Sequence, residues 1–146
     1  MEKRAKVRWV QNLQFVGMDT KGHSVVMDGR PPEEGGTGEG TGLSPSIMLL
    51  ISLAGCTAMD VVSILRKKRQ VVTGMEVNVI GLQPDTYPRP FQRIELEFTI
   101  RGKNINPAAV ERAIELSENK YCVVGQTLKP TAEIVTSYRI EEDERF

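Results

Sequence analysis

Alternation of apolar and polar positions marks three short strands at the start of the chain. A period of two places successive side chains on opposite faces of a sheet. This pattern covers three segments separated by short turns, residues 3–10, 13–17 and 24–28. We therefore predict a three-stranded meander, followed by a flexible glycine- and proline-rich loop over residues 29–42.

A long apolar segment follows this loop and predicts a helix that begins at Ser44-Pro45 and ends near Lys68. Ser accepts hydrogen bonds from the unpaired amides of a helix start, and Pro fits the first helical position. Asp60 would cost about 2.5–3.5 kcal/mol near the centre of a membrane span. We therefore expect no membrane segment but a long central helix buried by protein on most sides, which favours a homodimer.

The second half of the chain continues with period-two segments and one more amphipathic helix. Strands are predicted at residues 75–79, 93–101 and 134–140, and a helix from Asn106-Pro107 that ends or bends near residues 119–122. Residues 141–146 are expected to form a solvated tail. The order βββ-α-ββ-α-β with mostly antiparallel pairing predicts an α+β fold and a single domain over residues 1–146.

Composition narrows the function classes. The 146 residues contain 19 Lys and Arg against 19 Asp and Glu, so the formal net charge is zero. A nucleic-acid partner is not expected, because phosphate binding usually needs an excess of basic residues. The N-terminus contains no signal peptide pattern, so we expect a cytoplasmic protein.

The sequence lacks the motifs of a phosphate-binding loop and of a metal site. The glycines between residues 35 and 42 lack the spacing of a phosphate-binding loop. His23 is the only histidine and lies in a turn, and the chain contains no CxxC pair, so the sequence predicts no metal site.

The two cysteines are the remaining candidates for chemistry. Cys56 lies in the middle of the predicted long helix, and Asp60 lies one turn later on the same face, where it would raise the pKa of the thiol. Cys122 follows Tyr121 at the end of the second helix, where we expect a more accessible thiol than in mid-helix. These observations leave two interpretations open, two inert buried thiols or a redox pair.

Two cysteine-containing segments together carry a resemblance to a known family. SPSIMLLISLAGCTAMDVVSIL and LSENKYCVVGQTL, with the order of elements, resemble the OsmC/Ohr family of thiol-dependent hydroperoxide reductases, and the segment after Cys56 is closer to the YhfA-type branch than to Ohr itself. The resemblance implies the OsmC-like fold, an intertwined homodimer, a peroxidatic Cys56 and a resolving Cys122. It also implies an organic hydroperoxide substrate, a dithiol reductant of the lipoyl type, a role in oxidative stress defence, and no metal or flavin.

The chain departs from Ohr proteins in the groups around the thiolate. Ohr proteins use an arginine of the N-terminal hairpin, where this chain has Met18, and a glutamate just after the proline, where it has Ser46. Arg30 is the nearest replacement for the arginine, so Ser46, Asp60 and Arg30 are the candidate supporting residues.

An apolar mouth beside Cys56 would suit a lipid-like peroxide, and three side chains are predicted to form it: Met48, Ile51 and Met59. The alternative function is a non-enzymatic protein on the same fold that binds an apolar small molecule or senses redox state.

Overall fold

The computed structural model describes residues 1–145 and divides the chain into two compact units, Met1–Leu49 and Leu50–Phe146. Helix α1 (Pro45–Lys67) begins in the first unit and continues in the second. A single domain over residues 1–146 stays a prediction.

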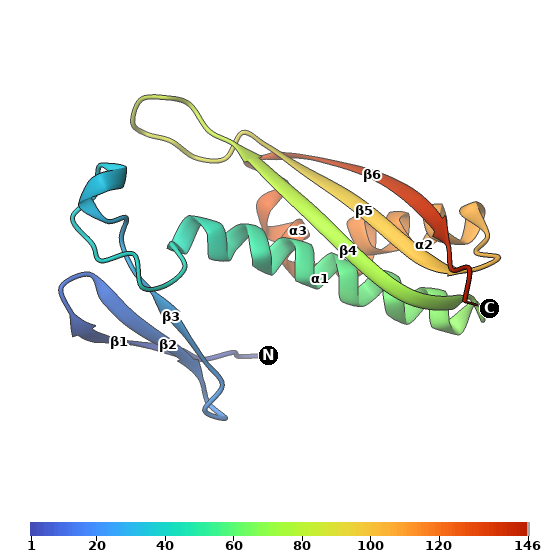
Figure 1. Cartoon of the computed structure of the whole chain (residues 1–146), viewed down its shortest axis with the longest axis horizontal. Helices are drawn as coiled ribbons and strands as arrows, with labels where there is room; N and C mark the ends of the chain where they lie inside the picture. The colour runs from blue at the N-terminus through green and yellow to red at the C-terminus, as the bar shows by residue number, and fades with distance from the viewer. Residues whose placement is uncertain (146) are drawn as a thin grey trace. The chain divides into compact units, whose positions relative to one another are not determined.

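The N-terminal unit contains the predicted meander. Strands β1 (Ala5–Gln11), β2 (Gln14–Asp19) and β3 (Ser24–Met27) pair antiparallel in the order β1-β2-β3 (Figure 1). Strand β1 is exposed along its whole length, and the Trp9 side chain is 64% exposed. The apolar positions of this sheet are therefore largely uncovered in the single chain.

The loop after β3 is held by one carboxylate and differs from the flexible loop that the sequence predicts. Asp28, which is 3% exposed, accepts hydrogen bonds from the backbone N–H of Gly29 (2.7 Å) and from the N–H and hydroxyl of Thr41 (3.1 and 2.5 Å). A Cβ at Gly38 would lie 2.2 Å from the carbonyl oxygen of Gly29, so glycine is required where the two backbone segments meet. Apart from the short 3-10 helix η1 (Pro32–Glu34), the loop is irregular but internally bonded.

The C-terminal unit is built on a second three-stranded sheet. Strands β4 (Val71–Leu82), β5 (Arg93–Lys103) and β6 (Glu133–Glu142) lie in the order β4-β5-β6 (Figure 1). The pairing of β4 with β5 is antiparallel, whereas β6 runs parallel to β5. The α+β class with mostly antiparallel pairing is confirmed, with this parallel pair as its exception.

A helical crossover explains the parallel pair, since it returns the chain to the end of the sheet at which β5 begins. It comprises α2 (Pro107–Leu116), the π-helix η2 (Ser117–Tyr121) and α3 (Val123–Leu128). Asn106 caps α2 as predicted, because its side chain accepts from the N–H of Ala108 at 3.0 Å. The predicted bend near residues 119–122 is the π-helix, and α3 was not expected from the sequence.

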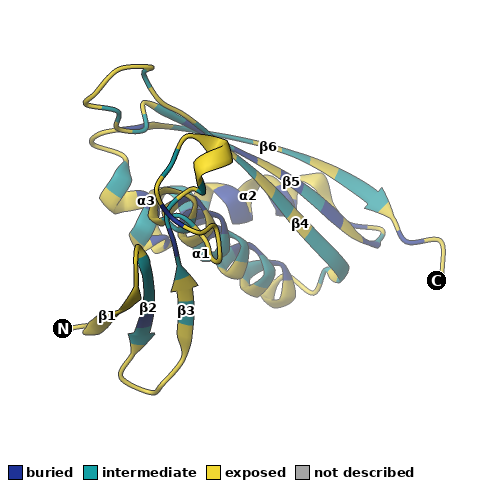
Figure 2. Cartoon of the chain, turned by 60° about the vertical axis from the view of Figure 1, so that its left-hand side comes forward, coloured by how far each residue is buried: buried dark blue, intermediate teal, exposed yellow. Residues whose placement is uncertain are grey.

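The core of this unit lies between the sheet and the helices that cover one of its faces (Figure 2). Strand β5 shows the predicted alternation, with four fully buried apolar side chains: Ile94, Leu96, Phe98 and Ile100. Burying side chains of this size stabilises a fold by about 1.5–3 kcal/mol each.

In the single chain helix α1 is buried on one face, and its predicted burial on most sides within a homodimer stays a prediction. Six of its residues are buried: Leu50, Leu53, Ala54, Thr57, Val61 and Leu65. On the other face Ile51 and Met59 are exposed, Met59 by 75%. The helix is long and apolar enough to cross a membrane by length and composition, a test that the core helix of a soluble protein also passes.

The C-terminal tail is less solvated than predicted. Glu141 and Glu142 belong to β6, and Asp143 is 3% exposed and accepts a hydrogen bond from the Thr73 hydroxyl at 2.6 Å. Arg145 also donates to Asp143, at 2.7 and 2.9 Å. The prediction is therefore wrong for residues 141–143, whereas Glu144 and Arg145 are exposed as predicted, and Phe146 lies outside the described residues.

Candidate functional site

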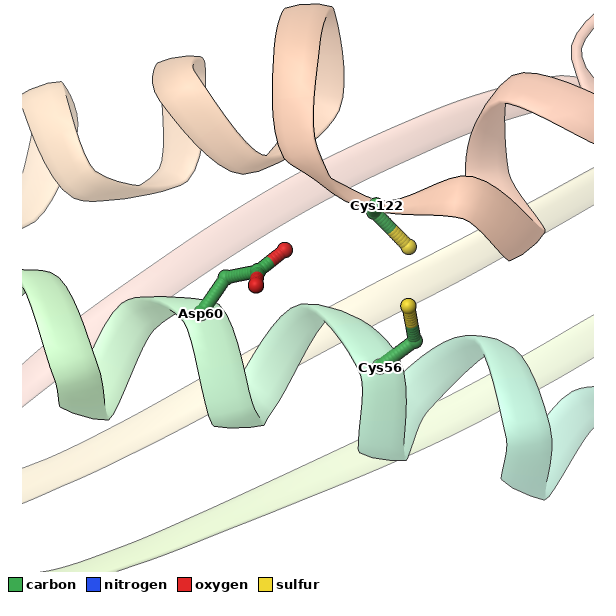
Figure 3. Close-up of side chains that lie close together, drawn as sticks. All are labelled: Cys56, Asp60 and Cys122. Atoms are coloured by element: carbon green, nitrogen blue, oxygen red, sulfur yellow. The ribbon is translucent and has the colours of Figure 1, made fainter. Parts of the chain in front are cut away.

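The structure brings together two thiols that are far apart in the sequence. The Sγ atoms of Cys56 and Cys122 and a carboxylate oxygen of Asp60 all lie within 4.8 Å of one another (Figure 3). Cys56 and Asp60 project from successive turns of α1, as their spacing of four residues predicts. Cys122 projects towards them from the extended residue between η2 and α3.

Backbone geometry after the π-helix fixes the position of Cys122. Its extended conformation (φ −75°, ψ 101°) ends η2 and caps α3, with the Gly125 N–H donating to Sγ at 3.3 Å. The Thr57 hydroxyl lies 3.5 Å from the same sulfur and 3.1 Å from the carbonyl oxygen of Leu53. Cys122 is 1% exposed, so the prediction that it is the more accessible thiol is wrong. The turn directs it onto α1, while Cys56 is half-buried.

Asp60 is held by a hydroxyl rather than by a cation. Ser117 donates to Oδ2 of Asp60 at 2.8 Å, and Asp60 forms no salt bridge with any residue between 1 and 145. Asp60 also lines a pocket of about 380 Å³ together with Lys67 and Tyr121. The carboxylate therefore has an oxygen directed to the thiols and a route to solvent.

The surroundings of Cys56 raise the pKa of its thiol. Burial is the largest cause, and the neighbouring Cys122 and the negative charge of Asp60 raise the pKa further. The backbone N–H of Val124 opposes these effects by hydrogen bonding to the sulfur. None of these groups is cationic, so the single chain leaves Cys56 mainly protonated near neutral pH.

The other candidate supporting residues belong to the N-terminal unit. Arg30 is an exposed residue of the loop. The Ser46 hydroxyl lies 3.3 Å from that of Ser44, which caps α1 by accepting from the N–H of Ile47 at 3.3 Å. The predicted cap is thus confirmed, while the roles of Arg30 and Ser46 at the thiol stay predictions.

A groove of about 820 Å³ runs between α1 and β4. Ile51 and Met59 line it, as do Met75, Val77 and Val79 of β4, whereas Met48 and Cys56 are not among its lining residues. The predicted apolar mouth beside Cys56 therefore corresponds in part to a groove on another face of α1.

Sequence reasoning did not identify the residues that hold the two thiols and the carboxylate in place: Thr57, Ser117, Val124 and Gly125. Of these residues only Thr57 could have been found from the sequence, because it is a hydroxyl residue that directly follows Cys56 in the predicted apolar helix. The partners of Cys122 depend on α3, which the sequence did not predict.

Comparison with known proteins agrees with this architecture. The family model of OsmC-like proteins matches residues 37–137. The protein YhfA of Escherichia coli strain K12 is 39% identical over 137 residues, which are 94% of this chain and 97% of that protein.

Solved structures show the same fold. A hypothetical protein from Aquifex aeolicus VF5 superposes with a TM-score of 0.84 at 26% identity, covering 99% of each chain. An organic hydroperoxide resistance protein OsmC from Legionella pneumophila superposes with a TM-score of 0.68 at 16% identity, covering 94% of this chain and 96% of that one.

Proposed function

The chain belongs to the OsmC family, and from that membership we propose that it is a two-cysteine reductase of organic hydroperoxides. One observation carries the proposal: the sulfur atoms of Cys56 and Cys122 lie within 4.8 Å of each other although 66 positions separate the two residues in the sequence. A disulfide between them would shorten this separation to an S–S bond of about 2.05 Å.

The proposed reaction has three steps that balance. The Cys56 thiolate attacks the O–O bond of the hydroperoxide, and the leaving alkoxide takes a proton to give an alcohol and a Cys56 sulfenic acid. The Cys122 thiol then attacks that sulfur, water leaves, and a disulfide forms. A dithiol reductant restores both thiols by exchange and is itself oxidised to a disulfide.

The exposure of the two thiols supports the proposed role of each. Cys56 is half-buried, so a peroxide can reach it, whereas Cys122 is buried and bonded to the Gly125 N–H. This difference supports Cys56 as the attacking thiol and Cys122 as the resolving one. Asp60 is placed to exchange protons with the pair through its solvent-lined side.

A second copy of the chain would complete this site. The exposed apolar side chains of β1 and of α1, such as Trp9 and Met59, favour a homodimer that covers them. Such a dimer also offers a source for the missing cation, for which Arg30 remains the candidate. We place the protein in the cytoplasm, where thiols are kept reduced.

The groove between α1 and β4 favours one alternative, the binding of an apolar small molecule without chemistry. It is lined mainly by aliphatic side chains and has a volume typical of ligand sites. The raised pKa of Cys56 agrees with this alternative as well, since a protonated thiol is a poor nucleophile.

Peroxide turnover separates these functions. With tert-butyl hydroperoxide and dihydrolipoamide we expect steady consumption by the wild type and loss to background for Cys56→Ser, because no thiolate attacks. Cys122→Ser should stop after one turnover and leave a sulfenic acid that dimedone labels on Cys56.

His23→Ala is the matched control, since within residues 1–145 the side chain of this exposed residue bonds only to Asp19, and the substitution should leave the turnover unchanged. Unchanged turnover in Cys56→Ser would end the proposal. A wild type without turnover, with apolar ligand retained in native mass spectra, would support the binding protein instead.

A further inference from the structure

The cluster at the candidate site also has the composition of a metal site, which the sequence does not predict. Two thiols and one carboxylate offer one ligand atom each, and the three atoms lie within 4.8 Å of one another. We propose that the reduced protein binds one divalent transition-metal ion of the zinc type through Cys56, Cys122 and Asp60, with water as the fourth ligand.

The donor set suits such an ion. Thiolates select zinc-like metals, and a carboxylate oxygen completes sites with an open position. In a tetrahedral site with Zn–S bonds of about 2.3 Å, the two sulfurs lie about 3.8 Å apart. The observed limit of 4.8 Å therefore requires closure by at most about 1 Å, which side-chain rotation can supply.

Neighbouring groups hold each ligand in the orientation that metal binding needs. Ser117 donates to Oδ2 of Asp60 and restrains the carboxylate, whose oxygens keep further lone pairs for the ion. The N–H groups of Val124 and Gly125 bond to the sulfurs of Cys56 and Cys122, respectively, and such bonds stabilise bound thiolates.

The negative charge of the cluster also favours a bound cation. Two thiolates and a carboxylate would carry three negative charges, and Asp60 forms no salt bridge within residues 1–145. A divalent ion would neutralise most of this charge as the two thiol protons are released. The pocket of about 380 Å³ opens the cluster to solvent at Asp60.

Metal binding and the disulfide exclude each other. When a hydroperoxide oxidises the metal-bound pair, the two thiolates give two electrons to form the disulfide, the peroxide takes these with two protons to form an alcohol and water, and the ion is released. The metal binding itself does not rest on the proposed peroxide chemistry. Only one consequence rests on the proposed function: the ion would hold the reductase inactive until a hydroperoxide oxidises the pair.

Cobalt(II) is the probe, because sulfur-to-cobalt charge-transfer bands report thiolate ligation directly. Titration of the reduced full chain should give one ion per chain, with thiolate bands and tetrahedral d–d bands. Cys122→Ser should lose the charge-transfer intensity of one thiolate, and the disulfide form should bind no ion. Asp60→Asn should weaken zinc binding at least about tenfold in competition with a chromophoric chelator.

Two substitutions control for adventitious sites, and circular dichroism checks that every variant is folded. Asp85→Asn, in the exposed β4–β5 loop, and His23→Ala should leave the affinity unchanged. Absence of thiolate bands in the reduced wild type, or equal affinity in Asp60→Asn, overturns the proposal. If the protein forms the disulfide with peroxide but binds no cobalt, only the metal site is contradicted. If it binds cobalt but does not turn over peroxide, only the reductase function is contradicted.

Discussion

Two aspartates, one in each unit, show how the same side chain is used for structure and for chemistry. Asp28 is surrounded by hydrogen-bond donors from Gly29, Glu39 and Thr41 and orders the loop after β3. Asp60 receives one hydroxyl, from Ser117, and otherwise faces two thiols.

The two carboxylates differ in whose pKa is affected. The hydrogen bond from the Thr41 hydroxyl is the main cause that lowers the pKa of Asp28 itself, so its charge is stabilised by the fold. The charge of Asp60 instead contributes to raising the pKa of Cys56. A carboxylate saturated with donors indicates structure, while one with a single donor beside nucleophiles indicates chemistry.

The largest effect is expected where the loop allows no side chain. Gly38→Ala would place a Cβ 2.2 Å from the carbonyl oxygen of Gly29, so the backbone around Asp28 must move. We expect a loss of about 2–4 kcal/mol in the free energy of unfolding, measured by denaturant titration. Gly74→Ala is the control, since its Cβ would make an ordinary contact of 3.7 Å, and it should change stability by less than about 1 kcal/mol. Equal effects of the two substitutions would show that the loop is not closely packed.

Exchanging the two carboxylates for amides tests the comparison directly. Asp28→Asn replaces an acceptor-only group with one that has a donor facing backbone N–H groups, so we expect the melting temperature to fall by several degrees. Asp60→Asn should change it little, because Ser117 can still donate to the amide oxygen.

The pH dependence of the melting temperature shows whether the charge of Asp28 stabilises the fold. Because the folded-state pKa of Asp28 is lowered, its stabilising effect is present above the unfolded value of about 3.9 and is lost as the pH falls through the folded value. The wild type should therefore lose stability on acidification more steeply than Asp28→Asn. Parallel acid curves for the two proteins would contradict a structural role for this charge.

The sequence predicts local structure well wherever a side chain signals it. Ser44 and Asn106 cap the helices that they were expected to begin, and the alternating residues of β5 are buried as the period of two requires. The spacing of Cys56 and Asp60 gives their shared face of α1 for the same reason. These features depend on residues within a few positions of one another.

Features that depend on distant partners were missed. Helix α3 has six residues, includes Gly125, and begins at a cysteine rather than at a usual capping residue. The fit of the loop around Asp28 depends on backbone contacts that no periodicity reveals. The parallel pairing of β6 was accessible in principle, since a strand that follows a helical crossover usually returns parallel.

The smallest expected effect concerns the pH at which Cys56 becomes reactive. Burial raises the pKa of its thiol, so the rate of alkylation by iodoacetamide, followed by peptide mass spectrometry, should still be rising above pH about 8.5, where an unperturbed thiol is half ionised. Asp60→Asn should shift this midpoint slightly downward, because the charge of Asp60 is the weakest of the influences that raise it. Asp85→Asn should leave it unchanged, since that carboxylate has no part in the site. A wild-type midpoint below that of an unperturbed thiol would instead indicate a cation acting on Cys56. If Arg30→Ala then raised the midpoint, the cation would be Arg30 of the N-terminal loop. That loop would then take part in the chemistry, and the contrast between a structural region around Asp28 and a chemical region around Asp60 would not hold.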